Sequence, residues 1–571
     1  MDNSSKRIKI VRPNYPLYTP TEYKGNLVLY RIFFSLFILL LLTFNIYLVF
    51  STIEMVQLGL RPLAFSLNFY IFAVGGFTTN FALMVLWNYG RRFLPLDKPP
   101  GYKGKTWHSD SNDLPFVSIV IPTYQESPTI LRRTLLACLD LNYPDEKLEV
   151  VVLEDNATNN VIEDLCHSLD VRYIYREHRR GYKAGAINDS LPMLNGELVL
   201  FIDSDHLLER NIILNSMNYW REKTIAVQMR VDYVNMHTFL TYTAAFLQMQ
   251  FFSYYQVARR KTGSAIFAGG TALFDKRLLI KEGGMNELTI ADDTDTSYIL
   301  VSRGYRIEYL NRIGGWGLIP WEPVSLVRQV WRWLSGTARS FRARIFTILR
   351  GKAPIYAKID HATNAFFPIL GVISYFLPYA FLGLYLIDSP FVSSNVGIFG
   401  IPLSAVLYPL IGIIPILTGY VVLINENPDI LYTKKPFLSK ILYLSTFYLF
   451  IYTVQPLMII GIFRGLFGED LEFNRTPKER IQKEKKPSKG LSNKDRYAIY
   501  TIVLALIGST LLILVYPFNL MDVRILAVLY LALNSFVPII FAIFWYWKID
   551  NYLETIGDVS TDMILREEIY P

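Results

Sequence analysis

Long uncharged stretches frame a more polar middle region in this chain of 571 residues. The first two stretches, at residues 32–53 and 62–90, are each long enough to cross a bilayer as a helix. Five more apolar stretches follow the middle region, at residues 362–387, 398–424, 441–467, 498–517 and 523–547. The pattern predicts an integral membrane protein with a cytosolic domain inserted between α-helical transmembrane segments.

The basic residues indicate how the chain is oriented. Lys and Arg precede the first stretch and follow the second, whereas the loop between them holds only Glu54 and Arg61. Basic residues are retained on the cytoplasmic side, so both ends of this hairpin are expected there. The Lys-rich loop at 475–496 favours the same side, so either 398–424 or 441–467 is expected not to span. We expect a multi-pass cell-membrane protein with about six crossings, both termini and the middle domain being cytoplasmic.

This organisation divides the chain into five parts. Residues 1–94 are a cytosolic tail and a transmembrane hairpin, and residues 95–350 are a cytosolic domain with interface helices. The remaining parts are transmembrane and interface helices at 351–467, a cytosolic basic loop at 468–496, and a hairpin with a tail at 497–571.

Composition changes this picture little. The net charge of +8 does not indicate nucleic-acid binding, because the basic residues flank the apolar stretches. The two cysteines, Cys138 and Cys166, form no disulfide framework, which fits a reducing compartment. The six histidines are scattered without metal-ligand spacing.

The middle region alternates short apolar runs with helical patterns. Strands are predicted at 116–121, 149–153, 171–175, 198–202 and 225–231, and helices at 128–139 and 183–194. Such alternation predicts a mostly parallel sheet with helices on both faces, which binds ligands at the carboxyl ends of its strands. The uncharged stretch at 233–258 is interpreted as an interface helix, because a crossing there would separate the two groups of acidic residues described next.

Two acidic positions follow predicted strands. Asp203 and Asp205 come directly after the strand at 198–202, where alternate carboxylates can share a hard divalent cation, although this spacing is also common by chance. Asp155 follows the strand at 149–153, where it would either bind a base or ribose or cap a helix.

Two further motifs begin helices. Lys183 lies between Gly181 and Gly185, in a turn that would either approach a phosphate or simply be a basic turn. Asp292, Asp293 and Asp295 crowd three carboxylates, whose repulsion raises the pKa of at least one of them. Asp293 is therefore our candidate for a general base, the alternative being an acidic helix start.

The segment 322–346 has the clearest helical period. Its apolar positions form one stripe bordered by arginines, as on a helix lying in a membrane interface: Val324, Val327, Trp331, Leu334, Ala338, Phe341 and Ile345. Gln329, Arg332 and Trp333 lie on the opposite face. An indole turned away from the lipid would stack on a sugar or pack on the α/β domain, and Arg332 would reach a diphosphate.

Taken in order, these motifs resemble those of the processive family 2 glycosyltransferases, which include cellulose, mannan and hyaluronan synthases. The resemblance covers about residues 115–480 and implies a glycosyltransferase-A-type, Rossmann-like catalytic domain. It implies nucleotide binding by Thr123, Tyr124, Glu126, Asp155, Lys183 and Arg332, metal binding by Asp203 and Asp205, and catalysis by Asp293. It also implies acceptor binding by Gly270, Thr271, Gln329 and Trp333, and a gating loop with Phe473, Arg475, Thr476 and Lys478.

The implied enzyme is an inverting glycosyltransferase that uses Mg²⁺ or Mn²⁺ and a nucleotide sugar, either a UDP- or a GDP-hexose. It would elongate and translocate a β-linked polysaccharide in contact with membrane lipids, without nucleic acid. One alternative is transfer of a single sugar to a lipid or glycolipid acceptor, and another is a non-enzymatic transporter or scaffold that keeps the fold. The donor sugar stays open, because Glu154-Asp155 and Ala291-Asp292-Asp293 depart from the family's usual Asp-Asp and Thr-Glu-Asp. Accessory subunits stay open as well.

Overall fold

A computed structural model describes residues 114–156, 160–235, 251–320, 323–366 and 458–468. It also describes single residues in 28–53, 241–248 and 368–372, and two short strands, β9 (Gly397–Ile398) and β10 (Ile401–Pro402). None of the helices within this part of the chain combines the length and the hydropathy needed to cross a membrane. Most of the predicted transmembrane stretches lie outside the described residues.

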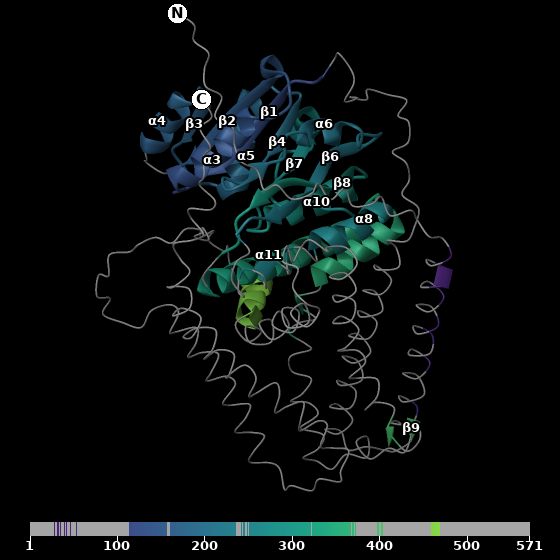
Figure 1. The fold of residues 1–571 in the computed structure, drawn as a ribbon. Helices are drawn as coiled ribbons and strands as arrows, with labels where there is room; N and C mark the ends of the chain where they lie inside the picture. The colour runs from purple at the N-terminus through teal and green to yellow at the C-terminus, as the bar shows by residue number, and fades with distance from the viewer. Residues whose placement is uncertain are drawn as a thin grey trace, which may run out of the picture.

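All five predicted strands are present in an eight-stranded sheet. They are β1 (Val117–Thr123), β2 (Leu148–Asp155), β3 (Arg172–Arg176), β4 (Leu198–Phe201) and β6 (Thr224–Tyr233). Three strands were not predicted: β5 (Leu207–Leu208), β7 (Ala272–Asp275) and β8 (Arg306–Gly317). The strand order is β3-β2-β1-β4-β7-β6-β8-β5 (Figure 1).

The sheet is mixed, but six of its eight strands run in the same direction, as predicted for a mostly parallel sheet: β3, β2, β1, β4, β6 and β8. Strand β7 runs antiparallel to both of its neighbours, β4 and β6, and β5 runs antiparallel to β8. β5 and β7 are too short to produce a recognisable alternation, and the pairing of β8 with β6 contains register shifts. The neighbouring strands β3, β2, β1 and β4 are parallel, and their carboxyl ends therefore meet at one edge.

Helices cover both faces of the sheet, as predicted. The helices α3 (Pro128–Leu139), α4 (Asn160–Ser168) and α6 (Ile212–Met217) pack on one apolar layer. The other layer is covered by α5 (Tyr182–Ser190), α9 (Lys276–Lys281), α10 (Asp292–Ser302) and α11 (Pro323–Arg350). Short turns lie at η1 (Asp145–Lys147) and η2 (Leu191–Met193), and η3 (Phe251–Gln256) leads into α8 (Val257–Thr262). The interface helix predicted at 233–258 does not begin at Tyr233, because this residue belongs to strand β6. Pro128 fits the first turn of α3, where its missing N–H needs no partner.

The apolar stripe of α11 is covered by protein. Ala338 is fully buried against Ile462 and Val372, and Trp331 lies against Gly461. Residues 458–467 form the helix drawn in yellow-green beneath α11 in Figure 1. The expected lipid exposure of the stripe is therefore wrong for these positions, because a segment far away in the sequence packs on them.

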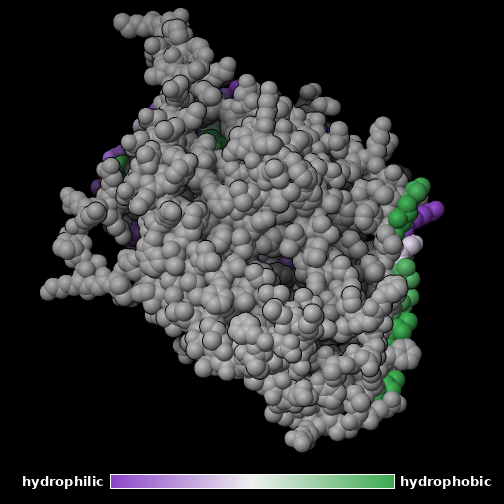
Figure 2. Space-filling model, turned by 60° about the horizontal axis from the view of Figure 1, so that its bottom comes forward, coloured by the Kyte–Doolittle hydropathy of each residue, from purple (hydrophilic) through white to green (hydrophobic). Residues whose placement is uncertain are grey.

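An apolar row is exposed near the N-terminus. The eight described residues between 28 and 53 are helical, and six of them are apolar: Val28, Ile32, Leu39, Leu42, Ile46 and Ile53. Each of these six side chains is at least 48% exposed. Figure 2 shows them as a green row along one edge of the molecule.

Glu154 is a buried carboxyl group at the end of β2. The Thr123 hydroxyl donates to its Oε2 over 2.9 Å, whereas its Oε1 has no partner among the described residues. Burial, and to a smaller extent the charges of Glu126 and Asp155, raise the pKa of Glu154 from 4.5 to about 7. The folded chain therefore holds a proton that the unfolded chain has already released between these two pH values.

Replacing Glu154 by Gln is expected to stabilise the protein at pH 8. Stability falls as pH rises from 4.5 to about 7, because the folded-state pKa is the higher one. The substitution should recover up to about 3 kcal/mol at pH 8 and little at pH 4, read from the shift in Tm at each pH. Glu146→Gln, at an exposed position, is the control. Equal Tm shifts at the two pH values would contradict a buried, titrating Glu154.

Candidate functional site

A cavity of about 240 Å³ opens at the carboxyl ends of β1, β2 and β4. Of the predicted site residues, the following line it: Thr123, Tyr124, Glu126, Asp155, Lys183, Asp203, Asp205, Asp293, Gln329, Arg332 and Trp333. They come from strand ends, from the start of α5 and α10, and from α11. The predicted gating-loop residues Phe473, Arg475, Thr476 and Lys478 lie outside the described residues.

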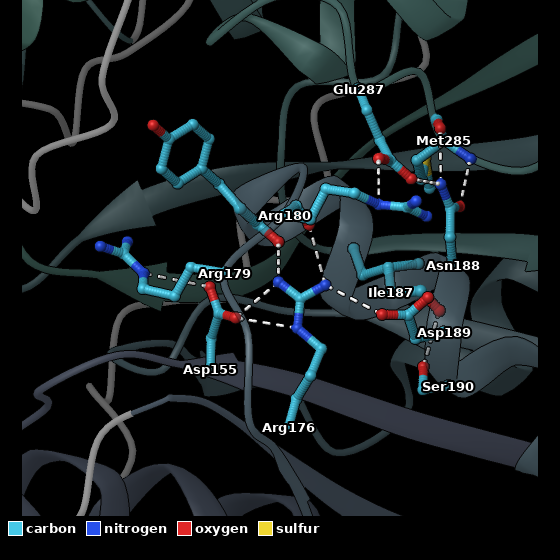
Figure 3. A network of polar contacts seen from close by, with 11 residues as sticks. Asp155, Arg176, Arg179, Arg180, Ile187, Asn188, Asp189, Ser190, Met285 and Glu287 are labelled. Atoms are coloured by element: carbon cyan, nitrogen blue, oxygen red, sulfur yellow. Dashed lines mark hydrogen bonds and ion pairs between the residues drawn. The ribbon is translucent and has the colours of Figure 1, made fainter.

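One end of the cavity is built around Asp155. The Arg176 guanidinium donates to Asp155 Oδ1 from Nε over 2.9 Å and from Nη2 over 2.5 Å, and Arg179 Nε lies 3.5 Å from Oδ2 (Figure 3). The Arg179 guanidinium also lies over the Tyr124 ring, 3.4 Å from its centroid. Asp155 is therefore held by two cations rather than capping a helix, which removes that alternative.

The middle of the cavity holds a cluster suited to a cation. Asp203, Asp205 and His206 each offer a ligand atom, and these atoms lie within 4.8 Å of one another. Asp205 Oδ2 accepts the Leu318 N–H over 2.7 Å, which fixes the carboxylate. Two carboxylates and one imidazole fit a divalent ion such as Mn²⁺ or Mg²⁺.

His206 corrects the interpretation of the histidines as scattered. Its Nδ1 lies 3.0 Å from the Thr271 hydroxyl, and its Nε2 lies 3.7 Å from Asp203 Oδ2. Its place directly after Asp205 is the sequence signal that could have identified it. Thr271 is fully buried behind this cluster, and a Cβ on Gly270 would come within 3.1 Å of Asp203 and His206, so neither of these predicted acceptor residues reaches the cavity.

Lys183 connects the cluster to the remaining acidic residues. Its Nζ donates to Asp203 Oδ1 and to the Gly269 carbonyl, each over 2.5 Å. Burial lowers the pKa of Lys183, but the charges of Asp203, Asp292 and Asp293 outweigh burial, so the pKa is raised overall. The ammonium group stays charged and is placed to meet an anionic ligand.

Asp292 and Asp293 form an acidic pair that both begins α10 and lines the cavity. Burial first, and the charge of Asp293 second, raise the pKa of Asp292 from 3.8 to about 7. Burial also raises the pKa of Asp293. Asp295 does not belong to this group, because it is buried in an ion pair with Arg344 at 3.0 Å. Two carboxylates rather than the expected three therefore share the site.

The helix α11 supplies the far wall of the cavity. Gln329, Arg332 and Trp333 all line it, whereas Trp331 packs on the opposite side against Gly461. Burial lowers the pKa of Arg332, and the charges of Asp293, Asp203 and Asp292 oppose this shift. The predicted opposite faces of α11 are thus confirmed. The Arg332 guanidinium lies close enough to Asp203, Asp292 and Asp293 to interact with their charges.

Part of the chain matches a known family. The family described as "Glycosyltransferase like family 2" matches residues 115–336.

Three similar proteins carry different names. The cellulose synthase catalytic subunit [UDP-forming] of Pseudomonas fluorescens is 27% identical over 46% of this chain and 36% of its own length. Glucomannan 4-beta-mannosyltransferase 2 of Arabidopsis thaliana is 27% identical over 49% of this chain and 56% of its own length. The beta-monoglucosyldiacylglycerol synthase of a Nostoc species is 29% identical over 34% of this chain and 43% of its own length. The chain thus spans between about a third and just over half of the relatives it matches.

Among solved structures, the mannosyltransferase PcManGT of Pyrobaculum calidifontis, in complex with GDP-Man and Mn²⁺, aligns with a TM-score of 0.46. It is 21% identical and is covered over 100% of its length, against 71% of this chain.

Proposed function

Because residues 115–336 are a family 2 glycosyltransferase domain, we propose that this protein is an inverting, metal-dependent glycosyltransferase that elongates a β-linked polysaccharide from a nucleotide sugar. The family match supports the enzyme class predicted from the sequence. The donor, the acceptor and translocation of the product are parts of the proposal.

One observation carries the proposal. A single cavity places the acidic pair Asp292 and Asp293 beside Lys183 and the cluster of Asp203 and Asp205. A glycosyl transfer needs a base on one side of the anomeric carbon and positive charge on the other side, at the departing diphosphate. The cavity contains both.

The residues would act in one displacement. Asp293 accepts the proton of the acceptor hydroxyl while its oxygen attacks the anomeric carbon and the bond to the nucleoside diphosphate breaks, which inverts the configuration. Arg332 and Lys183 donate N–H groups to the departing phosphate oxygens. Asp203, Asp205 and His206 would hold Mg²⁺ or Mn²⁺, which supplies further positive charge to the diphosphate. Trp333 would stack on the acceptor sugar, with Gln329 beside it.

A polymer is the favoured product. The names of the cellulose synthase and the mannosyltransferase support it, and so does an aromatic side chain at the acceptor end of the cavity. The second candidate is transfer of one sugar to a lipid, which the similarity to the diacylglycerol enzyme favours.

A membrane location is also part of the proposal. The exposed apolar row at 28–53 supports it, as does the basic pattern around the apolar stretches. The crossings, the orientation and the five-part division of the chain stay predictions.

A donor panel tests the function. Purified full-length protein in nanodiscs with Mn²⁺ or Mg²⁺ would be given UDP- and GDP-hexoses, and nucleotide release and product size would be measured. Release with long product supports the polymer synthase, and release with only short or lipid-linked product supports the single transfer. No release with any donor, in the presence of both metals, would contradict the proposal.

The acidic pair makes the rate depend on pH. Since burial raises the pKa of both Asp292 and Asp293, the pair takes up protons on the acid side and kcat/KM should fall there. Asp292→Asn removes the neighbouring negative charge, so the acid limb of the kcat/KM profile should move to lower pH. An acid limb that does not move would mean that the two carboxylates titrate independently.

A further inference from the structure

Arg176, which the mechanism does not use, is the centre of the polar network in Figure 3. It is the last residue of β3, and only 9% of its side chain is exposed. Besides the two bonds to Asp155 Oδ1, Nη2 donates to the Tyr182 carbonyl over 3.0 Å. Nη1 donates to the Arg180 carbonyl over 2.9 Å and to Asp189 over 3.0 Å. These five bonds use all five N–H groups of the guanidinium.

The turn that Arg176 holds is strained. Tyr182 has a φ of +49°, a left-handed conformation that a residue with a side chain rarely adopts. Such a residue costs about 1–3 kcal/mol and persists only when its surroundings impose it. Arg176 bonds the carbonyls of Arg180 and Tyr182 on both sides of Gly181, so it supplies that constraint.

The fit around the guanidinium is close. A Cβ on Gly185, in the first turn of α5, would come within 2.9 Å of Arg176 Nη1. The next residue after the strained turn is Lys183, whose ammonium lies on Asp203. The position of Lys183 therefore depends on a turn whose carbonyl groups accept hydrogen bonds from Arg176.

Arg176 also restricts Asp155. Both acceptor sites of Oδ1 are filled by Arg176, so Oδ2, which accepts one 3.5 Å bond from Arg179, is the oxygen with a site left to meet a ligand. Asp155 lines the same cavity as Lys183, Asp293 and Trp333. If the transferred sugar lies by Asp293, the nucleoside lies at Asp155 and the diphosphate at Lys183.

We propose that Arg176 is a positioning residue that holds the two ends of the donor site, Asp155 and the turn before Lys183, in one geometry. The inference rests on the proposed function. Its physical basis is that one planar guanidinium bonds β2, the turn and α5 at the same time, which an ammonium group cannot do.

Arg172 provides a matched control on the same strand. It lies four residues earlier, so it is on the same side of β3. It donates to the Met193 carbonyl over 2.9 Å and to Glu149 over 3.3 Å, and its side chain is 40% exposed. Arg172→Gln removes an arginine of β3 without touching the turn.

The test measures dissociation constants of UDP and of GDP with Mn²⁺ on the full-length protein in nanodiscs, by calorimetry. Arg176→Gln should raise the Kd of the better nucleotide at least about tenfold, since several charge-assisted bonds are lost together. It should also bring the Kd values of UDP and GDP closer, because Asp155 is then no longer held in one orientation toward the nucleobase. Donor KM should rise far more than kcat falls, and Arg176→Lys should not restore binding. Arg172→Gln should leave both Kd values unchanged.

Three results would overturn the inference: unchanged binding by Arg176→Gln, an equal loss in Arg172→Gln, or equal weakening of UDP and GDP together with a matching loss of kcat. If Arg176→Gln does not accumulate, Asp189→Ala removes one bond at the exposed side, and its Kd should rise about two- to fivefold; an unchanged Kd would count against the inference. A wild-type protein that binds neither nucleotide would overturn the proposed function as well, whereas nucleotide binding with an unaffected Arg176→Gln would overturn this inference alone.

Discussion

Replacing Asp293 by Asn is expected to lower kcat by at least about 10³-fold, because a positioned general base contributes about 10²–10⁴ and the amide cannot accept the proton. The substitution keeps the size of the side chain, and Asp293 Oδ1 already accepts the Thr294 N–H, a bond that an amide oxygen can keep. Nucleotide binding should therefore change little. Single-turnover rates and nucleotide Kd values, measured on the same preparation, separate the two quantities.

Asp292 is the rival for the role of base, because it belongs to the same pair and lines the same cavity. If Asp293→Asn keeps more than about a tenth of the rate while Asp292→Asn loses it, the role moves to Asp292. If both variants keep the rate, no carboxylate of this pair acts as the base.

Replacing Arg332 by Met is expected to lower kcat by about 10²–10³-fold, the usual cost of removing one donor from a developing negative charge. The methylene stem is kept, so the loss reports the guanidinium. Arg332 lies in the field of Asp203, Asp292 and Asp293, and its removal leaves that group of carboxylates with less compensating charge. We therefore also expect weaker nucleotide binding, which a Kd for the bare nucleoside diphosphate would measure.

Arg328→Met is the matched control, since Arg328 lies one turn earlier on α11 and is exposed. It should leave kcat within about twofold of the wild type. A comparable loss in both variants would assign the effect to the fold of α11, and an unchanged rate in Arg332→Met would remove Arg332 from the mechanism.

The local pattern predicted the parallel half of the sheet and the site residues that follow it. The strands at Val117–Thr123 and Leu148–Asp155 contain apolar runs at residues 119–121 and 150–153, and such runs indicate buried strands whatever their neighbours are. Asp155 and Asp203 could be placed at one edge because parallel strands bring their carboxyl ends together. The helical period of α11 likewise placed Gln329, Arg332 and Trp333 on one face, and the structure confirms that face as a cavity wall.

Several features depended on the tertiary structure alone. The direction of β7 depends on long-range pairing with β4 and β6, which four residues cannot encode locally. The stripe of α11 looked like a lipid-facing surface until residues 458–467 were found on it, because apolar periodicity specifies a buried face but not what covers it. His206 became a candidate ligand only when Thr271 and Asp203 were found beside it, and Arg176 was noticed only through bonds to β2, the turn and α5.

The sequence by itself determined the chemistry available to this protein: its acidic pairs, its lysine turn and its arginine and tryptophan on one helical face. These follow from residue identity and from periods of two and 3.6, which are local properties. The tertiary structure decided which of these groups share a cavity and which residues hold them there. That choice depends on pairing and packing between segments far apart in the sequence, such as those of Trp331 and Gly461, and no local period specifies it.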